Sequence, residues 1–248
     1  MKKPMIRFWA VAVWLLVWQT AAWLVGKPIL LVGPVEVLTR LFSLAQEASF
    51  WQAVWGSLWR IAGGFFLAFA LSVPLALGAS RLRWLRELLS PLMLTIKTVP
   101  VASFIILALI WFSSRTLSIL ISFLMVLPIL YSHLLDGLGQ VDRNLREMAA
   151  VFRVPRLRYL RCVALPQLMP AFLTGCRIAL GLGWKAGIAA EVIGTPAGTI
   201  GKWLQQAKLY LDTPDLFAWT VTVVALSVCF ERLTLLCLRG LQRLLERV

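Results

Sequence analysis

Long apolar runs separated by short polar stretches dominate the chain. A helix needs about twenty apolar residues to cross the hydrocarbon core of a bilayer, and six stretches reach that length. These stretches are residues 8–26, 57–79, 92–112, 115–135, 167–190 and 215–237. The pattern predicts an all-α integral membrane protein with six transmembrane helices. The third and fourth are expected to form a tight hairpin, because only Phe112-Ser113-Ser114-Arg115 joins them.

The composition supports lipid as the main solvent of this chain. Its 248 residues are 60% hydrophobic and 15% charged, whereas soluble domains are about 45–50% apolar and about 25% charged. The 12 tryptophans agree, since Trp favours the membrane–water interface. The first apolar run is longer than the about 7–15 residues of a signal-peptide core, so we interpret it as an uncleaved span.

The positive charges indicate how the spans are oriented. The chain has 25 Lys and Arg against 11 Asp and Glu, a net charge of +14. Most of these cations lie in alternate loops and at both termini, which argues against nucleic acid as a partner. The excess of Lys and Arg on cytoplasmic loops predicts that both termini are cytoplasmic. Residues 27–56 are then external and residues 136–166 cytoplasmic.

Two regions follow from this topology. Residues 1–56 are expected to hold the first span and an external amphipathic segment, and residues 57–248 a core of five spans. In the external segment, Gly33-Pro34 is typical of a helix start. Apolar residues then recur at helical spacing, at Val35, Leu38, Leu41, Phe42 and Ala45. We expect this helix to lie at the outer membrane surface.

The polar, arginine-rich segment 136–166 is the most informative part of the chain. Asp142 is a candidate N-cap, and Pro155 disfavours helix at the residue before it. One apolar face precedes this break, formed by Leu145, Met148, Ala149 and Phe152. A second face follows it, formed by Leu157, Leu160, Val163 and Ala164. The sequence predicts two short cytoplasmic helices, with Pro166 opening the next span. A basic loop bound to anionic headgroups is the alternative.

This segment resembles the EAA signature of ABC importer permeases. Glu147-Met148-Ala149, Val163 and Leu165-Pro166 have the spacing of that family's Glu-Ala-Ala, Ile and Leu-Pro. Arg153 stands where the family has a glycine between the two short helices. Since glycine readily adopts positive φ, we expect Arg153 to take that conformation at some cost or the turn to differ. The resemblance implies that the segment contacts an ATPase. The residues implied are Glu147, Met148, Ala149, Ala150, Arg153, Leu165 and Pro166.

Other stretches extend the resemblance over most of the chain. They are Ser57–Phe65, Lys97–Ala102, Gly175–Gly181 and Ala189–Glu191, and together they are most like the nitrate/sulfonate/taurine subfamily. The resemblance implies a type I ABC importer permease in the bacterial inner membrane, with a second permease copy, cytoplasmic ATPases and an extracytoplasmic solute-binding protein. ATP and Mg would be used by the ATPase, and this chain would bind no cofactor. An internal pair of Glu147 with Arg143 or Arg146 is the alternative to ATPase contact.

Ionisable residues inside the spans are candidates for the translocation path or a gate. They are Lys97, Arg177, Lys185 and Glu191, to which Pro100 is added because a proline can kink a helix. Lys97 could instead extend to the interface, and the other charges could form structural pairs. Two cations beside a path would favour an anionic solute such as a sulfonate. Trp111 and Trp184 could stack on an aromatic vitamin precursor, or anchor the interface.

Two other functional classes are weighed against the importer. An integral membrane enzyme would need a cluster of acids, histidines or a nucleophile with its base, but His133 is the single histidine. A channel or carrier that works without ATP would have no use for segment 136–166. The four cysteines lack metal-ligand spacing, and no G-x-x-x-x-G-K-[ST] phosphate loop occurs. Gly181, Gly183, Gly187 and Gly194 are expected to allow close helix packing.

Overall fold

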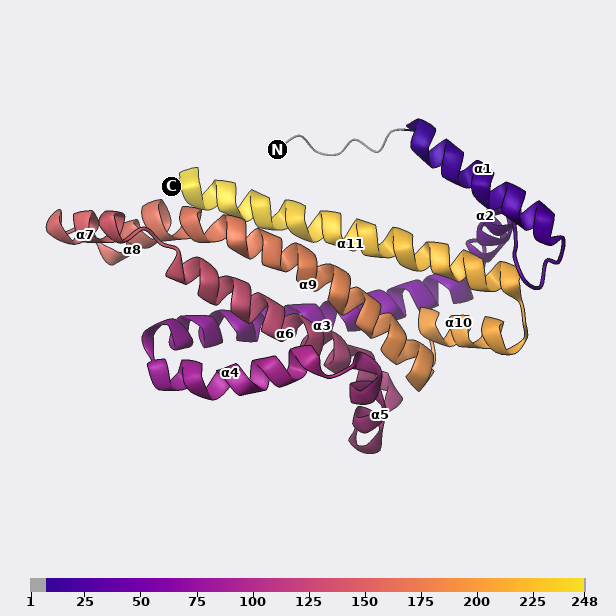
Figure 1. Ribbon diagram of the computed structural model, residues 1–248, viewed down its shortest axis with the longest axis horizontal. Helices are drawn as coiled ribbons and strands as arrows, with labels where there is room; N and C mark the ends of the chain where they lie inside the picture. The colour runs from indigo at the N-terminus through magenta and orange to yellow at the C-terminus, as the bar shows by residue number, and fades with distance from the viewer. Residues whose placement is uncertain (1–7, 248) are drawn as a thin grey trace.

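The computed structural model describes the backbone of residues 8–247. Side chains are described there except at residues 8, 143, 146, 156, 157, 241 and 243–247. The elements are α1 (Phe8–Val25), α2 (Pro34–Leu44), α3 (Ala48–Arg81), α4 (Arg83–Thr98), α5 (Val101–Trp111), α6 (Ser114–Gly139), α7 (Arg143–Val151), α8 (Arg156–Tyr159), η1 (Leu160–Ala164), α9 (Leu165–Gly194), α10 (Ile200–Leu209) and α11 (Thr213–Arg247). Figure 1 shows an elongated helical bundle with α7 and α8 at one extremity and α10 at the other.

Within the described residues, four helices are long and apolar enough to cross a membrane. They are α3, α6, the continuous helix Leu160–Gly194 and the Thr213–Gly240 part of α11. The count rises to five if α4 and α5 together form one broken span, and α1 is a shorter apolar helix. The chain is therefore an all-helical membrane protein with four or five candidate spans. The expected boundary between residues 56 and 57 falls inside α3, because that helix already begins at Ala48.

Residues 92–112 do not form the one continuous helix that a single span was expected to have. The chain instead forms α4 and α5, which are bent by 105° at a break. Val99 is extended there, with φ −72° and ψ 132°, and Pro100 is the N-cap of α5. Proline disfavours helical backbone at the preceding residue and has no N–H to continue the helical ladder. The proline that was expected to kink this helix therefore breaks it.

The core lies where α3, α6 and α9 pack together, and glycines allow close contact there. A Cβ on Gly183 would meet Val126 at 2.5 Å, and one on Gly187 would meet the Ser122 hydroxyl at 2.5 Å. Gly194 likewise packs against Leu117. The packing role is thus confirmed at these three positions, but it is wrong for Gly181, which faces open space.

The two tryptophans considered above occupy different places. Trp184 is 2% exposed and tilts against Phe230, so its expected interfacial position is wrong. Trp111 is 74% exposed, as an interfacial residue would be. The one histidine packs closely against Gly175 of α9, as a structural residue would.

The expected amphipathic helix is present as α2, with Pro34 in its first turn. Val37 and Leu44 are buried, whereas Val35, Leu38 and Phe42 are exposed. The side chain of Arg40 holds α2 to the start of α11, because its Nε and Nη2 groups both donate to the Asp215 carboxylate. That hydrogen-bonded carboxylate raises the pKa of Arg40 above its ordinary value.

Candidate functional site

Helix α7 begins as the sequence predicts. The Asp142 carboxylate accepts a hydrogen bond from the backbone N–H of Asn144 at 2.8 Å, which satisfies one of the free donors of the first turn. The backbone N–H of Asp142 donates to the side chain of Gln167 at 2.8 Å. This second contact ties the start of α7 to the first turn of α9, so α7 is fixed relative to a long bundle helix.

Arg153 adopts the positive φ that the family signature suggests at its position. Its φ is 48°, and it follows α7 in the place where glycine usually ends a helix. The N–H of Arg153 donates to Ala150 at 3.1 Å, and the N–H of Val154 donates to Ala149 at 2.9 Å. These two bonds form a Schellman motif, so the turn has the backbone that a glycine would give it.

The expected second short helix is not a separate element. After Pro155, α8 runs through the π-helical turn η1 directly into α9. The N–H of Leu165 donates to the carbonyl of Leu160, five residues earlier. The wide turn accommodates Pro166, which has no N–H and would clash with a tighter preceding turn. The segment that follows the α7 turn, α8 and η1, is therefore a rigid extension of the membrane-length helix α9.

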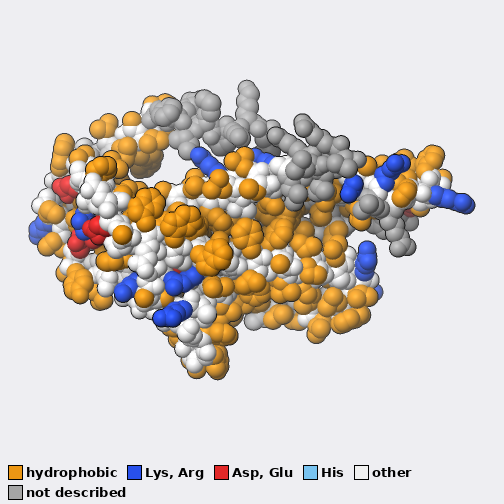
Figure 2. Space-filling view, turned by 180° about the vertical axis from the view of Figure 1, so that it is seen from behind, with side chains coloured by type: hydrophobic (Ala, Val, Ile, Leu, Met, Phe, Trp, Pro, Cys, Tyr) orange, Lys and Arg blue, Asp and Glu red, His pale blue; other side chains and the backbone are white. Residues whose placement is uncertain are grey.

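The segment α7–η1 projects from the end of the bundle (Figure 1). Ala149 is only 6% exposed, whereas Met148, Val151 and Phe152 are 48%, 78% and 74% exposed. Glu147, Ala150 and Arg153 are exposed, and Leu165 and Pro166 are partly buried. Lys and Arg side chains surround this extremity (Figure 2). The expected pairing of Glu147 with Arg143 or Arg146 lies outside the described side chains.

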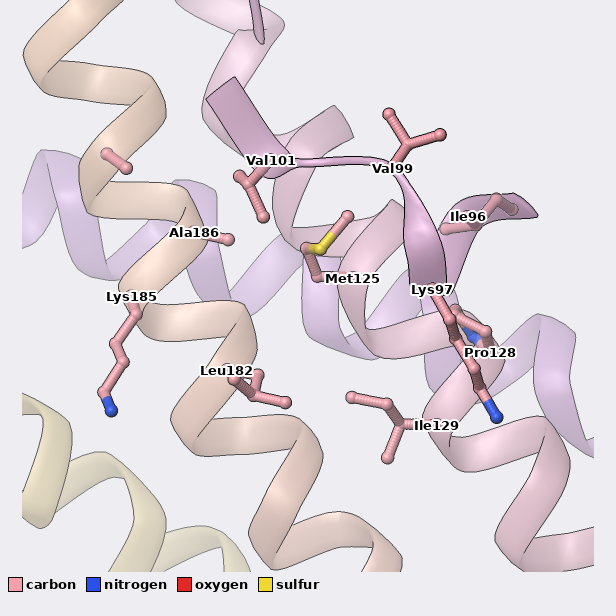
Figure 3. A pocket seen from close by; sticks show the side chains of 11 residues that line it. Ile96, Lys97, Val99, Val101, Met125, Pro128, Ile129, Leu182, Lys185 and Ala186 are labelled. Carbon is pink, nitrogen blue, oxygen red and sulfur yellow. The ribbon is translucent and has the colours of Figure 1, made fainter. Parts of the chain in front are cut away.

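A cavity of about 530 Å³ lies among α4, α5, α6 and α9. Lys97 lies on one side of it and Lys185 on the other, with Met125, Ile129 and Leu182 between them (Figure 3). Both ammonium groups point toward the end of the bundle that carries α7 (Figure 3). The structure thus brings together two of the predicted path residues on an otherwise apolar surface.

Two further residues of the predicted path, Arg177 and Pro100, do not line this cavity. Arg177 pairs with Glu231 of α11 at 3.2 Å, away from the cavity. Pro100 forms the break between α4 and α5, beside two cavity residues, Val99 and Val101. Lys97 donates to the hydroxyl of Ser132 at 2.7 Å. Of the three cations, only Lys97 and Lys185 line the cavity between α4 and α9.

Glu191 is fully buried at the α10 end of the bundle. Its Oε2 accepts from the Ser57 hydroxyl at 2.5 Å and from the N–H of Gly201 at 3.4 Å. Ser57 in turn accepts from the N–H of Ile200 at 2.9 Å. Among the described contacts, Glu191 therefore pairs with α3 and α10, not with Lys185. We call Ser57, Glu191, Ile200 and Gly201 the α10 clasp.

Sequence reasoning gave no role to Ser57 or Gly201. The signal for Ser57 was weak: one hydroxyl in an apolar helix, close to Gly56. Gly201 could be recognised only in three dimensions, because a Cβ there would collide with the side chain of Glu191. Both residues are needed for the clasp, since one supplies the hydroxyl and the other the close approach.

These features match one family. The chain belongs to the binding-protein-dependent transport system inner membrane component family, whose model matches residues 64–247. It is therefore a multi-pass permease subunit of a bacterial ABC importer in the inner membrane, and it is not the ATPase. ATPase and solute-binding protein partners follow from that system. Membership in this family also argues against the two other functional classes, an integral membrane enzyme and a channel or carrier that works without ATP.

Individual relatives support the nitrate/sulfonate/taurine type. The chain is 31% identical over 239 residues to the taurine transport system permease protein TauC of Escherichia coli, covering 94% of this chain and 85% of TauC. It is 30% identical over 237 residues to the riboflavin transport system permease protein RibX of Chloroflexus aurantiacus, covering 94% and 86%. It is 27% identical over 184 residues to the bicarbonate transport system permease protein CmpB of Synechococcus elongatus, covering 74% and 66%.

Proposed function

We propose that two copies of this chain form the membrane pathway of an importer for a small anionic solute. Residues 142–166 transmit the motion of the ATPases to the bundle. The observation that carries the proposal is the projecting α7 turn, held by a Schellman motif with Arg153 at φ 48°. Six spans, with α1 and a broken α4–α5 span among them, and cytoplasmic termini complete the proposed topology.

The coupling role rests on stiffness and on exposed apolar surface. The Asp142–Gln167 contact fixes the start of α7. The residues after the α7 turn belong to the continuous helix α8–η1–α9, which fixes the end of the turn. Met148, Val151 and Phe152 expose their side chains at the extremity. Apolar residues grouped in this way are typical of a protein docking surface. A rigid-body movement of an ATPase would therefore reach α9 without being absorbed by a flexible loop.

A second copy is supported by the face that carries the 530 Å³ cavity. Lys97 and Lys185 are both exposed in the single chain, although they belong to membrane-length or broken-span helices. A lysine facing the middle of a bilayer costs about 2.5–3.5 kcal/mol on insertion scales. Water and a second permease chain over this face would remove that cost. The cavity would then become part of a path between the two copies.

The charge of the cavity favours an anion. Lys97 and Lys185 are its only charged lining residues among those the structure describes. An anionic group crossing this cavity would pass two cations without meeting a carboxylate. The relatives named for taurine and bicarbonate fit such a solute, because both carry an anionic group. The apolar lining by Met125, Ile129 and Leu182 and the riboflavin relative favour a second candidate, a vitamin precursor.

Site-specific photo-cross-linking tests the coupling role. A benzophenone side chain is placed at Phe152 in the permease co-expressed with its ATPase, and a matched one at Leu209 on α10. Both positions are exposed, at 74% and 68%. We expect the Phe152 probe to label the ATPase and the Leu209 probe not to. Labelling of lipid alone from Phe152 would contradict the proposal.

A further inference from the structure

A second, more polar cavity lies between α4 and α6, nearer the α7 end of the bundle. Its volume is about 250 Å³, room for about eight water molecules at about 30 Å³ each. Its polar lining consists of Arg86, Ser90, Lys97, Tyr131, Ser132 and Asp136. Lys97 also lines the 530 Å³ cavity, so the two cavities meet at this side chain.

The two helices present these groups as matching stripes. On α4, Arg86, Ser90 and Lys97 are four and seven residues apart, which places them on one helical face. On α6, Tyr131 and Ser132 lie one turn before Asp136. The Lys97 ammonium donates to Ser132 at 2.7 Å, so it already crosses from one stripe to the other.

The hydroxyl of Tyr131 has no hydrogen-bond partner among the described residues. Tyr131 is only 4% exposed and lines the cavity, and its hydroxyl oxygen is buried. Arg86 lines the same cavity as this hydroxyl. A buried polar group without a partner costs free energy unless water or a ligand satisfies it. An anionic oxygen beside Arg86 and Lys97 would supply the missing acceptor.

We propose that Arg86, Lys97 and Tyr131 bind one small oxyanion group, namely a sulfonate, a carboxylate or a phosphate. The lining holds two positive side chains, Arg86 and Lys97, and one negative side chain, the exposed Asp136, so its net charge is positive. Lys97 would pass the anion from the larger cavity to this one, because its ammonium points toward the α7 end (Figure 3). The solute class and the position on the import route rest on the proposed function, but the binding itself does not.

The oxyanion can come from two sources, the imported solute or the headgroup of an anionic lipid. Fluorine NMR of trifluoromethanesulfonate measures binding directly, without nucleotide, to the purified permease–ATPase complex in phosphatidylcholine nanodiscs. We expect the wild-type complex to broaden the resonance. Arg86→Gln and Lys97→Gln should each weaken binding about tenfold or more, since a charge-assisted hydrogen bond is lost. Tyr131→Phe should weaken it roughly threefold, because one neutral hydrogen bond is lost.

Lys208→Gln is the matched control, because this exposed lysine lies on α10 at the opposite end of the bundle. It should bind the probe as the wild type does. Size-exclusion chromatography with the ATPase confirms that each variant is assembled. If phosphatidylglycerol in the nanodisc displaces the probe from the wild type, a headgroup occupies the site. If it does not, the site is open to a solute.

The proposal is overturned if Arg86→Gln, Lys97→Gln and Tyr131→Phe all bind the probe like the wild type. It is also overturned if Lys208→Gln weakens binding as much as they do. Both outcomes are independent of transport, because no ATP is present. A complex that binds the oxyanion but shows no ATP-dependent uptake would contradict the proposed function and leave this site standing.

Discussion

Replacing Ser57 with alanine should destabilise the α10 clasp. The substitution removes one hydroxyl from a fully buried position. The N–H of Ile200 then loses its acceptor, which lies 2.9 Å away, and Oε2 of Glu191 loses the donor at 2.5 Å. The remaining contact of Oε2, with the N–H of Gly201, is longer at 3.4 Å. Two buried polar groups are thus left with too few partners.

The magnitude follows from those two groups. A buried donor or acceptor without its partner costs about 1–3 kcal/mol, so we expect Ser57→Ala to lower the free energy of unfolding by about 2–4 kcal/mol. For a chain of this length, that corresponds to a melting temperature lower by roughly 5–15 °C. Glu191→Gln should cost less, because its amide retains an oxygen that can accept from Ser57 and Gly201.

Thermal unfolding of the purified permease–ATPase complex measures the effect. Ser80→Ala is the matched control, since Ser80 is exposed and, among the described residues, its hydroxyl bonds to the carbonyl of Leu77 in its own helix. That control should stay within about 0.5 kcal/mol of the wild type. If Ser57→Ala melts at the temperature of Ser80→Ala, the hydroxyl does not hold α10 and the reasoning fails.

Gly187→Ala should destabilise the complex by about 1–3 kcal/mol by overpacking, because its Cβ would lie 2.5 Å from the Ser122 hydroxyl. Gly181 faces open space, so Gly181→Ala should be tolerated. Equal melting temperatures of the two variants would contradict this prediction. Arg153→Gly should raise the stability of the α7 turn by roughly 1 kcal/mol, because glycine adopts positive φ without strain; slower hydrogen exchange at Val154 would show it, and faster exchange would count against it. Lys185→Gln should reduce uptake of an anionic solute about tenfold more than uptake of a neutral analogue, and equal reductions would remove the lysine from the path.

The sequence predicts the helical class because hydrophobic length is a strong local signal. Segment 142–166 was also readable, since Asp142, Pro155 and the spacing from Glu147 to Pro166 act through local backbone chemistry. The position of Pro166 within a continuous helix could not be predicted in this way. Whether a proline begins a helix or lies within a continuous one depends on the π-helical turn before it, which has no clear pattern in the sequence.

The contacts between distant segments could not be predicted in the same way. Glu191 and Ser57 lie 134 residues apart, and nothing in the local sequence selects a hydroxyl over Lys185 as the partner. The break at Pro100 was read as a kink because length and composition alone favour one span there. Arg86 and Tyr131 drew no attention, since a cation near a span end and a tyrosine in an apolar helix are both common.

The ratio of solute imported to ATP hydrolysed tests the coupling role of segment 142–166 most directly. It is measured in proteoliposomes that contain the permease, its ATPase and the solute-binding protein, for the wild type and for Glu147→Lys. Glu147 is exposed on α7, so the charge reversal alters the docking surface and leaves the buried core intact. We expect continued hydrolysis with a sharply lower ratio in Glu147→Lys. A wild-type ratio in that variant would contradict it.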